Sequence, residues 1–336
     1  MNTSDFDYQL PEGSIAQTPA EPRDSSRLLV LDKNSGAIQH RIFSDIGEYL
    51  HSGDLLVVNQ TRVIPARIFA NKSTGGKIEI LLLRREDELQ WECLVGGKGL
   101  TQGKKVRLQD GLEAEIVEVL GRSRRMVRFA EPVENHLASD GQMPLPPYIH
   151  EKLSNPERYQ TVYSQIPGSA AAPTAGLHFT PQLLESLQKK GVKLAAVTLH
   201  VGLDTFAPVT EDDPQQHVIH TEWCELNQET ALMIRETRRQ GGKIIAVGTT
   251  SVRTLESAAD SDSVVHPFSG PTSIFILPGY QYRVVDAMIT NFHLPKSTLI
   301  MMVSAYAGRE LILQTYQTAI EKGYRFFSFG DAMFIH

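Results

Sequence analysis

The feature that most constrains the fold is a change of pattern inside the chain. Between residues 67 and 130 the sequence breaks into six short runs of the kind that favours strands, separated by turns rich in glycine or charge. The runs are RIFANK, KIEILLLRR, LQWECLVG, KKVRLQ, AEIVEVL and RMVRFA. Turns at this spacing are typical of a small barrel or sandwich. The block therefore predicts an all-β module.

On both sides of this block the pattern alternates between strands and helices. We expect helices over residues 181–190, 228–240, 249–259, 298–307 and 309–322. We expect strands over residues 28–32, 54–59, 193–201, 221–226, 243–247, 273–277, 284–292 and 326–329. Such alternation implies a central sheet covered by helices. If the two N-terminal strands join that sheet, the fold is a discontinuous α/β domain, residues 1–64 and 151–336, with a small barrel-like all-β domain, residues 65–150, inserted.

Charge and composition narrow the classes of partner. The chain has 336 residues and a net charge of −6, so it has no overall basic surface for nucleic acid. A local patch would have to serve, and the segment GRSRRMVRFA offers one. Its candidate RNA-binding residues are Arg122, Arg124, Arg125 and Arg128. The alternative is the solvated face of a β-hairpin.

Several function classes are disfavoured. Cys93 and Cys224 lie far apart and form no C-x-x-C pattern, which indicates a reducing compartment. No signal-peptide pattern and no apolar run of membrane-spanning length occurs, so we expect a cytoplasmic protein without membrane contact. His217 and His220 are spaced H-x-x-H, with Glu222 as the nearest third ligand, but this pattern alone is weak, and we predict no metal site.

Residues 284–308 place polar groups where a strand meets a helix. Asn291 and His293 follow an apolar run, and Pro295 bars further strand pairing. Ser297 or Thr298 can then cap an apolar helix whose first N–H groups point back at those polar side chains. A capped turn explains the pattern as well as a catalytic site does.

A second junction follows the strand KIIAVG. Gly248 permits a tight turn, and Thr249, Thr250 and Ser251 bring three hydroxyls to a helix start, which suits a carboxylate or phosphate. Arg253 follows on the same helix. The segment matches neither a Walker motif nor a dinucleotide fingerprint. Capping explains one of the threonines, but hardly all three hydroxyls.

Two histidines adjoin loops and strand ends. His178 follows the small-residue loop AAAPTAGL and is a candidate proton carrier, although a lone histidine is more often a structural hydrogen-bonding group. His200 ends the strand AAVTLH, and Asp204 could orient it. Several titratable side chains at strand ends carry more weight together than any one alone.

The two ends of the chain add further candidates. Asp5, Tyr8 and Arg23 belong to a polar, proline-rich N-terminal arm, for which docking on the surface is the alternative. Asp331 lies among aromatic residues near the C-terminus, so burial would raise its pKa and suit it to acid–base work.

Taken in order, these segments resemble one family, the S-adenosylmethionine:tRNA ribosyltransferase-isomerases that make epoxyqueuosine in bacterial tRNA. The resemblance rests on DFDYQLPEGSIAQTPAEPRDSSRLLVLD, GDLLVVNQTRVIPARI, GGKIEILLL, AAPTAGLHFT, TLHVGLDTFAPV, GTTSVRTLES, the junction at 284–308 and FFSFGDAMFI. It runs nearly end to end and covers residues 86–158 least, so RNA contacts there are least supported.

The resemblance implies that the ribose of S-adenosylmethionine is transferred to 7-aminomethyl-7-deazaguanine at the tRNA wobble position and rearranged, releasing adenine and methionine. A base must remove a C5′ proton, which the sulfonium acidifies, and adenine needs a proton donor to leave. The substrate is consumed, so no cofactor is expected.

The roles that follow for individual residues are hypotheses. Asn291 and His293 would act at the ribose, with His178 beside adenine. The turn at Thr249, Thr250 and Ser251, with Arg253, would hold the methionine carboxylate or a tRNA phosphate. Further lining candidates are Asp5, Tyr8, Arg23, His200 and Asp331.

Two other functions remain open. A non-catalytic RNA-binding protein would use the arginine-rich β module, but it would need no polar clusters at strand ends. A tRNA methyltransferase that uses S-adenosylmethionine would normally carry a glycine-rich loop after its first strand, which this sequence lacks. The expected partners are S-adenosylmethionine and tRNA carrying 7-aminomethyl-7-deazaguanine, bound by a monomer.

Overall fold

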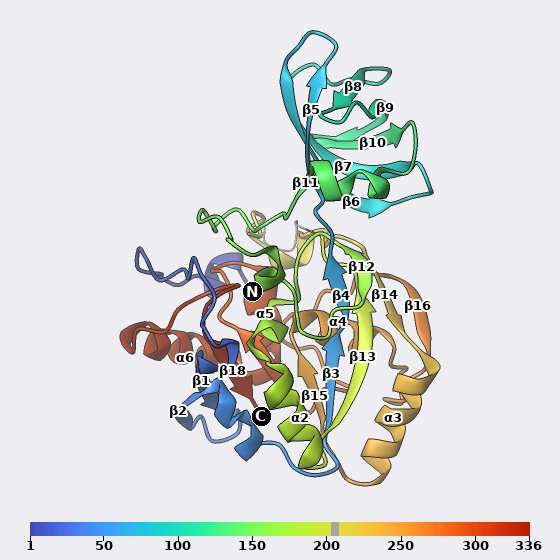
Figure 1. Ribbon diagram of the computed structural model, residues 1–336. Helices are drawn as coiled ribbons and strands as arrows, with labels where there is room; N and C mark the ends of the chain where they lie inside the picture. The colour runs from blue at the N-terminus through green and yellow to red at the C-terminus, as the bar shows by residue number, and fades with distance from the viewer. Residues whose placement is uncertain (203–207) are drawn as a thin grey trace.

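The larger domain is built on a nine-stranded sheet (Figure 1). The computed structural model describes residues 1–202 and 208–336. The strand order is β16-β14-β13-β3-β15-β17-β18-β1-β2, and β13, β3, β15 and β17 run parallel at its centre. The strands are β1 Arg27–Leu31, β2 Ile38–Ile42, β3 Leu55–Asn59, β13 Lys193–Leu199, β14 Glu222–Leu226, β15 Ile244–Val247, β16 Phe268–Thr272, β17 Ala287–Asn291 and β18 Ala332–Ile335.

Helices cover both faces of this sheet, which explains why the central strands are apolar throughout. Every residue of β3 and β15 is buried, the pattern expected of parallel strands with two covered faces. Leu55 and Val57 of β3 pack into the core on one face, whereas Leu56 and Val58 pack into the core on the other. The helices of this domain are α2 Pro181–Lys189, α3 Gln228–Arg239, α4 Thr249–Ser257, α5 Thr298–Ala307 and α6 Arg309–Glu321.

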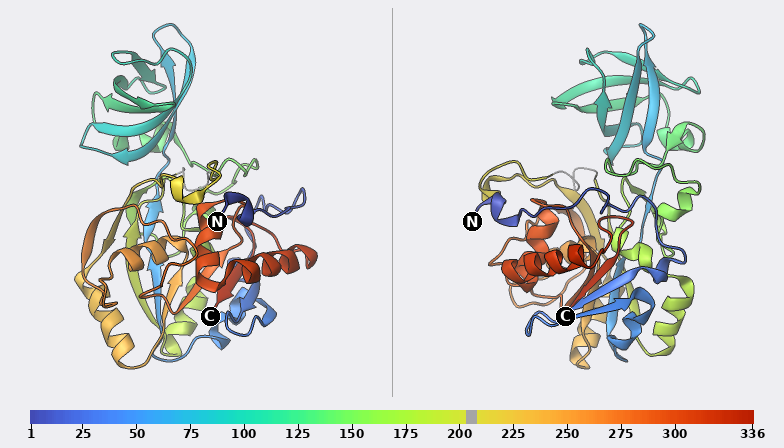
Figure 2. Two further views of the ribbon diagram at one scale, coloured as in Figure 1. Left: turned by 180° about the vertical axis from the view of Figure 1, so that it is seen from behind. Right: turned by 90° about the vertical axis from the view of Figure 1, so that its left-hand side faces the viewer.

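The six predicted β-like runs form a separate closed barrel. Its sheet has the order β11-β5-β6-β7-β10-β9-β8, and β5 also pairs with β8, which closes the barrel. The module contains β5 Arg67–Lys72, β6 Lys77–Arg85, β7 Gln90–Gly96, β8 Lys105–Leu108, β9 Glu113–Gly121, β10 Arg124–Phe129, β11 Gly141–Gln142 and the short helix α1 Leu137–Asp140. Figure 2 shows it standing apart on top of the larger domain. The predicted fold class is confirmed, and the domain limits at residues 64 and 151 stay a prediction.

Two expected strands are wrong. Residues 273–277 form no strand; instead β16 occupies Phe268–Thr272, where Gly270 and Pro271 disfavour strand structure. Pro271 is tolerated because β16 is an edge strand of the sheet. Residues 326–329 form a turn, and the last strand is β18, which follows it. Strand β2 was not predicted from the sequence, because it is an exposed edge strand.

The carboxyl ends of the parallel strands point toward the barrel. Strand β3 continues through β4 Thr61–Val63 into β5, so the carboxyl ends of the parallel strands face the module (Figure 1). Strand β4 pairs with β12 Ile166–Ser169 in a two-stranded ribbon at this junction. Ligands of α/β proteins bind beyond the carboxyl ends of parallel strands. Among the described residues, no helix is long and apolar enough to cross a membrane.

Candidate active site

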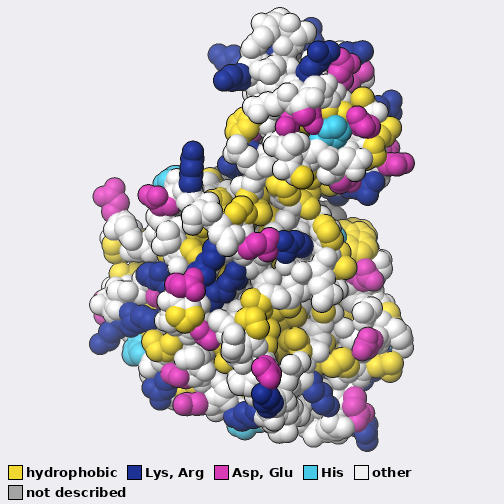
Figure 3. All heavy atoms as spheres, viewed as in Figure 1, with side chains coloured by type: hydrophobic (Ala, Val, Ile, Leu, Met, Phe, Trp, Pro, Cys, Tyr) yellow, Lys and Arg dark blue, Asp and Glu magenta, His cyan; other side chains and the backbone are white. Residues whose placement is uncertain are grey.

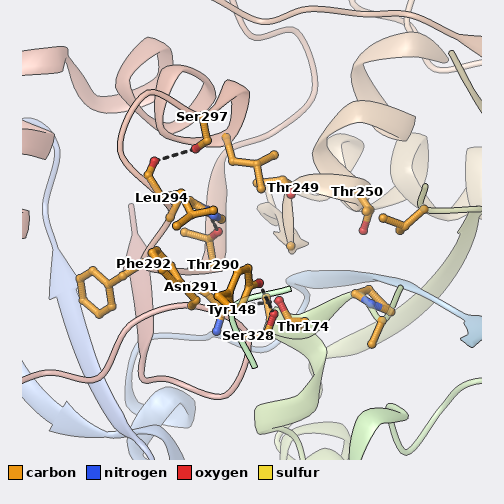
Figure 4. Close-up of a pocket in the computed structure, with 18 residues that line it drawn as sticks. Tyr148, Thr174, Thr249, Thr250, Thr290, Asn291, Phe292, Leu294, Ser297 and Ser328 are labelled. Carbon is orange, nitrogen blue, oxygen red and sulfur yellow. Dashed lines mark hydrogen bonds between the residues drawn. The ribbon is translucent and has the colours of Figure 1, made fainter. Parts of the chain in front are cut away.

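A cavity that is partly open to solvent lies beyond the carboxyl ends of β13, β15 and β17 (Figure 4). We call it the strand-end cavity. Its lining comes from residues at the ends of three strands, from the small-residue loop before His178, from the proline-rich segment 144–148 that follows the barrel, and from the C-terminal turn. The polar side chains that line it are Tyr148, Thr174, Thr249, Thr250, Thr290, Asn291, His293, Ser297 and Ser328. The structure thus brings together both predicted strand-to-helix junctions.

Asn291 is the last residue of β17, and its side chain is fixed at both ends. The hydroxyl of Thr174 donates to its Oδ1 at 2.9 Å, and its Nδ2 donates to Nε2 of His178 at 3.1 Å. The second ring nitrogen of His178, Nδ1, lies 2.7 Å from the hydroxyl of Ser26. If Nε2 accepts from the amide, the ring proton of neutral His178 is on Nδ1 and points to Ser26.

His293 faces the same cavity and is held through its backbone. Its carbonyl accepts a hydrogen bond from the hydroxyl of Tyr8, and its N–H donates to the hydroxyl of Tyr316 at 3.0 Å. Its Nε2 lies 2.6 Å from Oγ1 of Thr290, whereas its Nδ1 forms no hydrogen bond within the described part of the chain. Burial lowers the pKa of His293 to about 3, so the ring is neutral at physiological pH.

The start of α4 forms the opposite wall. Gly248 precedes the helix with φ +83°, a conformation that favours glycine, and a Cβ there would lie 3.5 Å from that of Ala175. Thr249 and Thr250 line the cavity, and Oγ1 of Thr250 is buried without a hydrogen-bond partner. Ser251 differs, because its hydroxyl donates to the carbonyl of Val247 at 2.8 Å. Only two of the three predicted hydroxyls therefore face the cavity.

Arg253 lies one helical turn farther along α4 and lines a small adjoining cavity that is partly open to solvent. We call this the arginine cavity. The guanidinium is buried and pairs through Nη1 with the carboxylate of Glu222. Its Nε and Nη2 are buried without a hydrogen-bond partner. Leu299 lines both cavities, so the two adjoin at its side chain.

His178 does not line the strand-end cavity. It is buried behind Asn291, and burial, followed by the nearby charges of Arg325 and Arg23, lowers its pKa to about 3. His178 therefore has no direct contact with this cavity, and its expected position beside adenine stays a prediction. The ring acts on Asn291, which itself faces the cavity.

The N-terminal candidates also lie outside the cavity lining. Asp5 forms an ion pair with Arg309 at 3.1 Å. Arg23 donates to the carbonyls of Gln160 and Glu157 at 2.6 and 2.9 Å, and burial lowers the pKa of its guanidinium. These contacts dock the N-terminal arm on the domain, which was the alternative left open by the sequence.

Tyr8 and Asp331 have supporting positions. Tyr8 packs edge-on against Tyr316 with 5.3 Å between ring centroids, and its hydroxyl donates to the carbonyl of His293. Asp331 accepts hydrogen bonds from the backbone N–H groups of Arg27 and Arg325 at 3.0 and 2.8 Å. Its carboxylate is thereby occupied in holding the C-terminal turn, and it does not line the strand-end cavity.

The predicted RNA patch has two kinds of arginine. Its members are Arg122, Arg124, Arg125 and Arg128. Arg124 pairs with Glu92 at 2.7 Å, and Arg125 donates to the carbonyl of Leu100 at 2.8 Å and to that of Arg122 at 2.7 Å. Arg122 and Arg128 are exposed. The barrel's own structure therefore uses two of the four guanidinium groups.

His200 lies on the far side of its strand end from the strand-end cavity. Its ring stacks on Trp223 with 5.7 Å between centroids, and burial lowers its pKa. Asp204, the residue expected to orient it, lies outside the described residues. His217 and His220 have different partners: His217 bonds to Glu211 at 2.8 Å, and His220 to Arg124 at 2.9 Å. Within residues 1–202 and 208–336, no three His, Cys, Asp or Glu side chains are grouped to hold a metal ion.

Sequence reasoning missed several lining residues. Tyr148 follows Pro146 and Pro147, and its hydroxyl lies 2.7 Å from that of Ser328. Thr174 is the one polar residue inside the small-residue loop, which was a usable signal. Thr290 comes directly before Asn291 at the same strand exit. Nothing in the sequence indicated that Ser26 meets His178, because 152 positions separate them.

Comparisons with known proteins agree with this architecture. Residues 3–335 match the family described as queuosine biosynthesis protein. The chain is 55% identical over 340 residues, with full coverage of both chains, to proteins named S-adenosylmethionine:tRNA ribosyltransferase-isomerase from Symbiobacterium thermophilum and Acetivibrio thermocellus.

A solved structure gives the same result. The S-adenosylmethionine tRNA ribosyltransferase from Thermotoga maritima is 40% identical, with a TM-score of 0.59 over 99% of this chain and 100% of that one. The chain belongs to the queuosine biosynthesis protein family.

Proposed function

We propose that the strand-end cavity is where this chain transfers the ribosyl group of S-adenosylmethionine to tRNA and isomerises it. The activity is the one that its 55% identical relatives are named for. The acceptor is 7-aminomethyl-7-deazaguanine at the wobble position, the product is epoxyqueuosine in tRNA, and adenine and methionine leave. The observation that carries the placement is the buried guanidinium of Arg253, which has two unused N–H groups next to a cavity lined by neutral polar side chains.

The arginine cavity fits the methionine part of the substrate. Its apolar wall includes Ile276, Met302 and Leu299, which suit the methylene groups of the methionine chain. Nε and Nη2 of Arg253 can hold the carboxylate with two parallel hydrogen bonds, while Glu222 keeps the guanidinium in place. The sulfonium would then lie near Leu299, where the two cavities adjoin.

The ribose would occupy the strand-end cavity between α4 and the end of β17. The amide of Asn291, fixed by Thr174 and His178, can hold a ribose hydroxyl in one orientation. His293 is the candidate base for the C5′ proton. In the tautomer whose Nε2–H donates to Thr290, its Nδ1 presents a lone pair to the cavity.

Adenine needs a proton as it leaves, and Tyr148 is the candidate donor. Its ring lies 5.1 Å from that of Phe327, and both line the cavity. Burial raises the pKa of the Tyr148 phenol, so it stays protonated and can donate a hydrogen bond to a ring nitrogen of adenine.

The amine of the acceptor base attacks as the neutral form, so its proton must also be accepted in the site. The RNA would reach the cavity from the side of the barrel, where the strand ends face. Single-stranded loop bases can be splayed into such a pocket. We further propose that one chain acts alone in the cytoplasm, and light scattering would check the monomer.

Product analysis tests this function. Protein, labelled S-adenosylmethionine and tRNA carrying 7-aminomethyl-7-deazaguanine are incubated, and the small molecules are separated. Adenine and methionine in equal amounts support the transferase-isomerase. S-adenosylhomocysteine would show a methyltransferase instead. Tight RNA binding without turnover would show the non-catalytic RNA-binding protein.

A further inference from the structure

A third and larger cavity, partly open to solvent, lies between the barrel and the α/β domain. We call it the junction cavity. The barrel contributes residues of β6, β7 and β10, including Leu83, Arg84 and Trp91. The α/β domain contributes residues after β13 and in β14, including His200 and Trp223. Figure 3 shows hydrophobic side chains gathered where the two domains meet.

Both tryptophans of the chain line this cavity. Trp223 is 36% exposed, although it is a large apolar side chain, and His200 stacks on it with an interplanar angle of 29°. Trp91 is 3% exposed, and its Nε1 is buried without an acceptor. A buried indole N–H normally has a partner. The cavity therefore offers an aromatic platform and an unused hydrogen-bond donor.

A second unused polar atom belongs to His200. Its Nδ1 is buried without a hydrogen-bond partner. Gly168 allows the ring to lie there, because a Cβ at residue 168 would be 3.0 Å from Cε1 of His200. A flat ligand with donors and acceptors on its edge could pair with such atoms.

The charges in the junction cavity are balanced. Arg84 pairs with Glu92 at 3.4 Å and with Glu86 at 2.7 Å. Arg85 pairs with Glu134 at 3.2 Å. Each of these arginines has a neighbouring carboxylate, so they add no net positive charge to the cavity, and an uncharged aromatic ring suits it.

The junction cavity and the strand-end cavity share one short stretch of backbone. Val201 lines the strand-end cavity, whereas its neighbours His200 and Gly202 line the junction cavity. Extended chain alternates its side chains in this way. A nucleotide next to the one in the strand-end cavity would therefore meet the junction cavity.

We propose that the junction cavity binds one nucleobase of the tRNA anticodon loop, adjacent to the modified base, by stacking on Trp223. The edge of the base accepts a hydrogen bond from the indole N–H of Trp91 and forms another with Nδ1 of His200. This inference rests on the proposed function, since the RNA must place its modified base in the strand-end cavity. Base stacking on an aromatic side chain tolerates any base, so affinity depends on the ring and not on the sequence.

The first test uses the two tryptophans as reporters. An anticodon stem-loop RNA is titrated into the protein without S-adenosylmethionine, and intrinsic fluorescence is measured. We expect the RNA to quench the emission, and Trp223→Phe to lose most of the quenching while it binds labelled RNA with nearly the affinity of the wild type. Binding without any change in tryptophan emission would overturn the proposal.

The second test separates stacking from folding. Trp223→Ala should bind the stem-loop roughly 5- to 100-fold more weakly, with an unchanged KM for S-adenosylmethionine. Val218→Ala is the matched control, because Val218 is 82% exposed close to β14 and does not line the cavity. A stem-loop that lacks the base on one side of the wobble position should bind the wild-type protein more weakly than the complete stem-loop does, by the same factor. Trp223→Ala should bind the two stem-loops with equal affinity.

The outcomes distinguish the two hypotheses. Equal affinity of Trp223→Ala and wild type, with adenine release intact, would overturn the stacking site and leave the proposed function standing. Absence of adenine release by the wild type would overturn the proposed function. In that case the fluorescence titration still decides whether RNA occupies the junction cavity.

Discussion

Nε2 of His178 lies 3.1 Å from the side-chain nitrogen of Asn291, and the ring is buried on the side away from the strand-end cavity. The histidine therefore supports the residue that faces the substrate. A buried amide fixed by two partners is a preorganised contact, because it needs no rearrangement when a hydroxyl arrives.

This relationship predicts how His178 variants behave. His178→Ala removes the acceptor of the Asn291 amide, so kcat should fall by about 10- to 100-fold through misplacement of that side chain. The shape of the pH–rate profile between pH 5 and 9 should stay the same, because the ring is neutral across that range. Loss of one limb of the profile in the variant would identify His178 as an acid or base and contradict the supporting role.

Arg253 should control the affinity for S-adenosylmethionine. Arg253→Lys keeps a positive charge beside Glu222 but removes the planar pair of N–H groups. We expect KM for S-adenosylmethionine to rise by about 10- to 100-fold, with a smaller change in kcat. Arg239→Lys, at an exposed position on α3, is the control and should leave both constants unchanged. An unaltered KM in Arg253→Lys would contradict the placement of the methionine carboxylate in the arginine cavity.

Protein stability should fall in mild acid because of two buried histidines. The pKa of His178 and of His293 is about 3 in the folded chain, against 6.5 when unfolded. Above pH 6.5 both states are neutral at these rings. Between pH 6.5 and 3 the unfolded chain binds the protons, so each ring lowers the free energy of unfolding by up to about 1.4 kcal/mol per pH unit as pH falls.

Urea unfolding at pH 7 and pH 5 measures this effect. The variant His178→Gln should show a shallower loss of stability between the two pH values than the wild type, because one of the two protonations is removed. A parallel loss in both proteins would mean that the ring titrates in the folded state as it does in the unfolded one.

The fold was largely predictable because its elements carry strong local signals. The apolar run of β15 followed by Gly248 and three hydroxyls gives both a strand end and a helix start, and α4 begins at Thr249 as expected. Strand β16 was not predicted because it contains Pro271, and proline lacks the backbone N–H that most strands donate. In residues 326–329 the aromatic pattern resembles a strand, but Phe327 adopts φ +68°, which strands do not allow.

The site was predictable in its position and less so in its details. Strand ends locate Asn291, His293 and Thr250, because chain topology brings such ends together. The sequence cannot show on which side of a loop a ring lies, so His178 and His200 were both assigned to the cavity. Each is turned away from it, toward Ser26 and Trp223 respectively.

The two kinds of barrel arginine should separate in experiment. Arg125→Gln removes guanidinium bonds to the carbonyls of Leu100 and Arg122, so it should lower the melting temperature by a few degrees, at about 1 kcal/mol per lost hydrogen bond. Arg122→Gln should leave melting unchanged. If the exposed arginines contact RNA, Arg122→Gln and Arg128→Gln together will flatten the salt dependence of tRNA binding. An unchanged salt dependence of tRNA binding would show that these arginines form a solvated surface without RNA contacts.

The most direct measurement of the central claim is adenine release by His293→Asn in the presence of tRNA carrying 7-aminomethyl-7-deazaguanine. S-adenosylmethionine binding is followed in parallel by calorimetry, so that loss of binding is distinguished from loss of chemistry. If His293 removes the C5′ proton, the variant will bind S-adenosylmethionine with similar affinity and release adenine at least about 100-fold more slowly. Adenine release at the wild-type rate would contradict the assignment of the strand-end cavity as the site of ribosyl transfer.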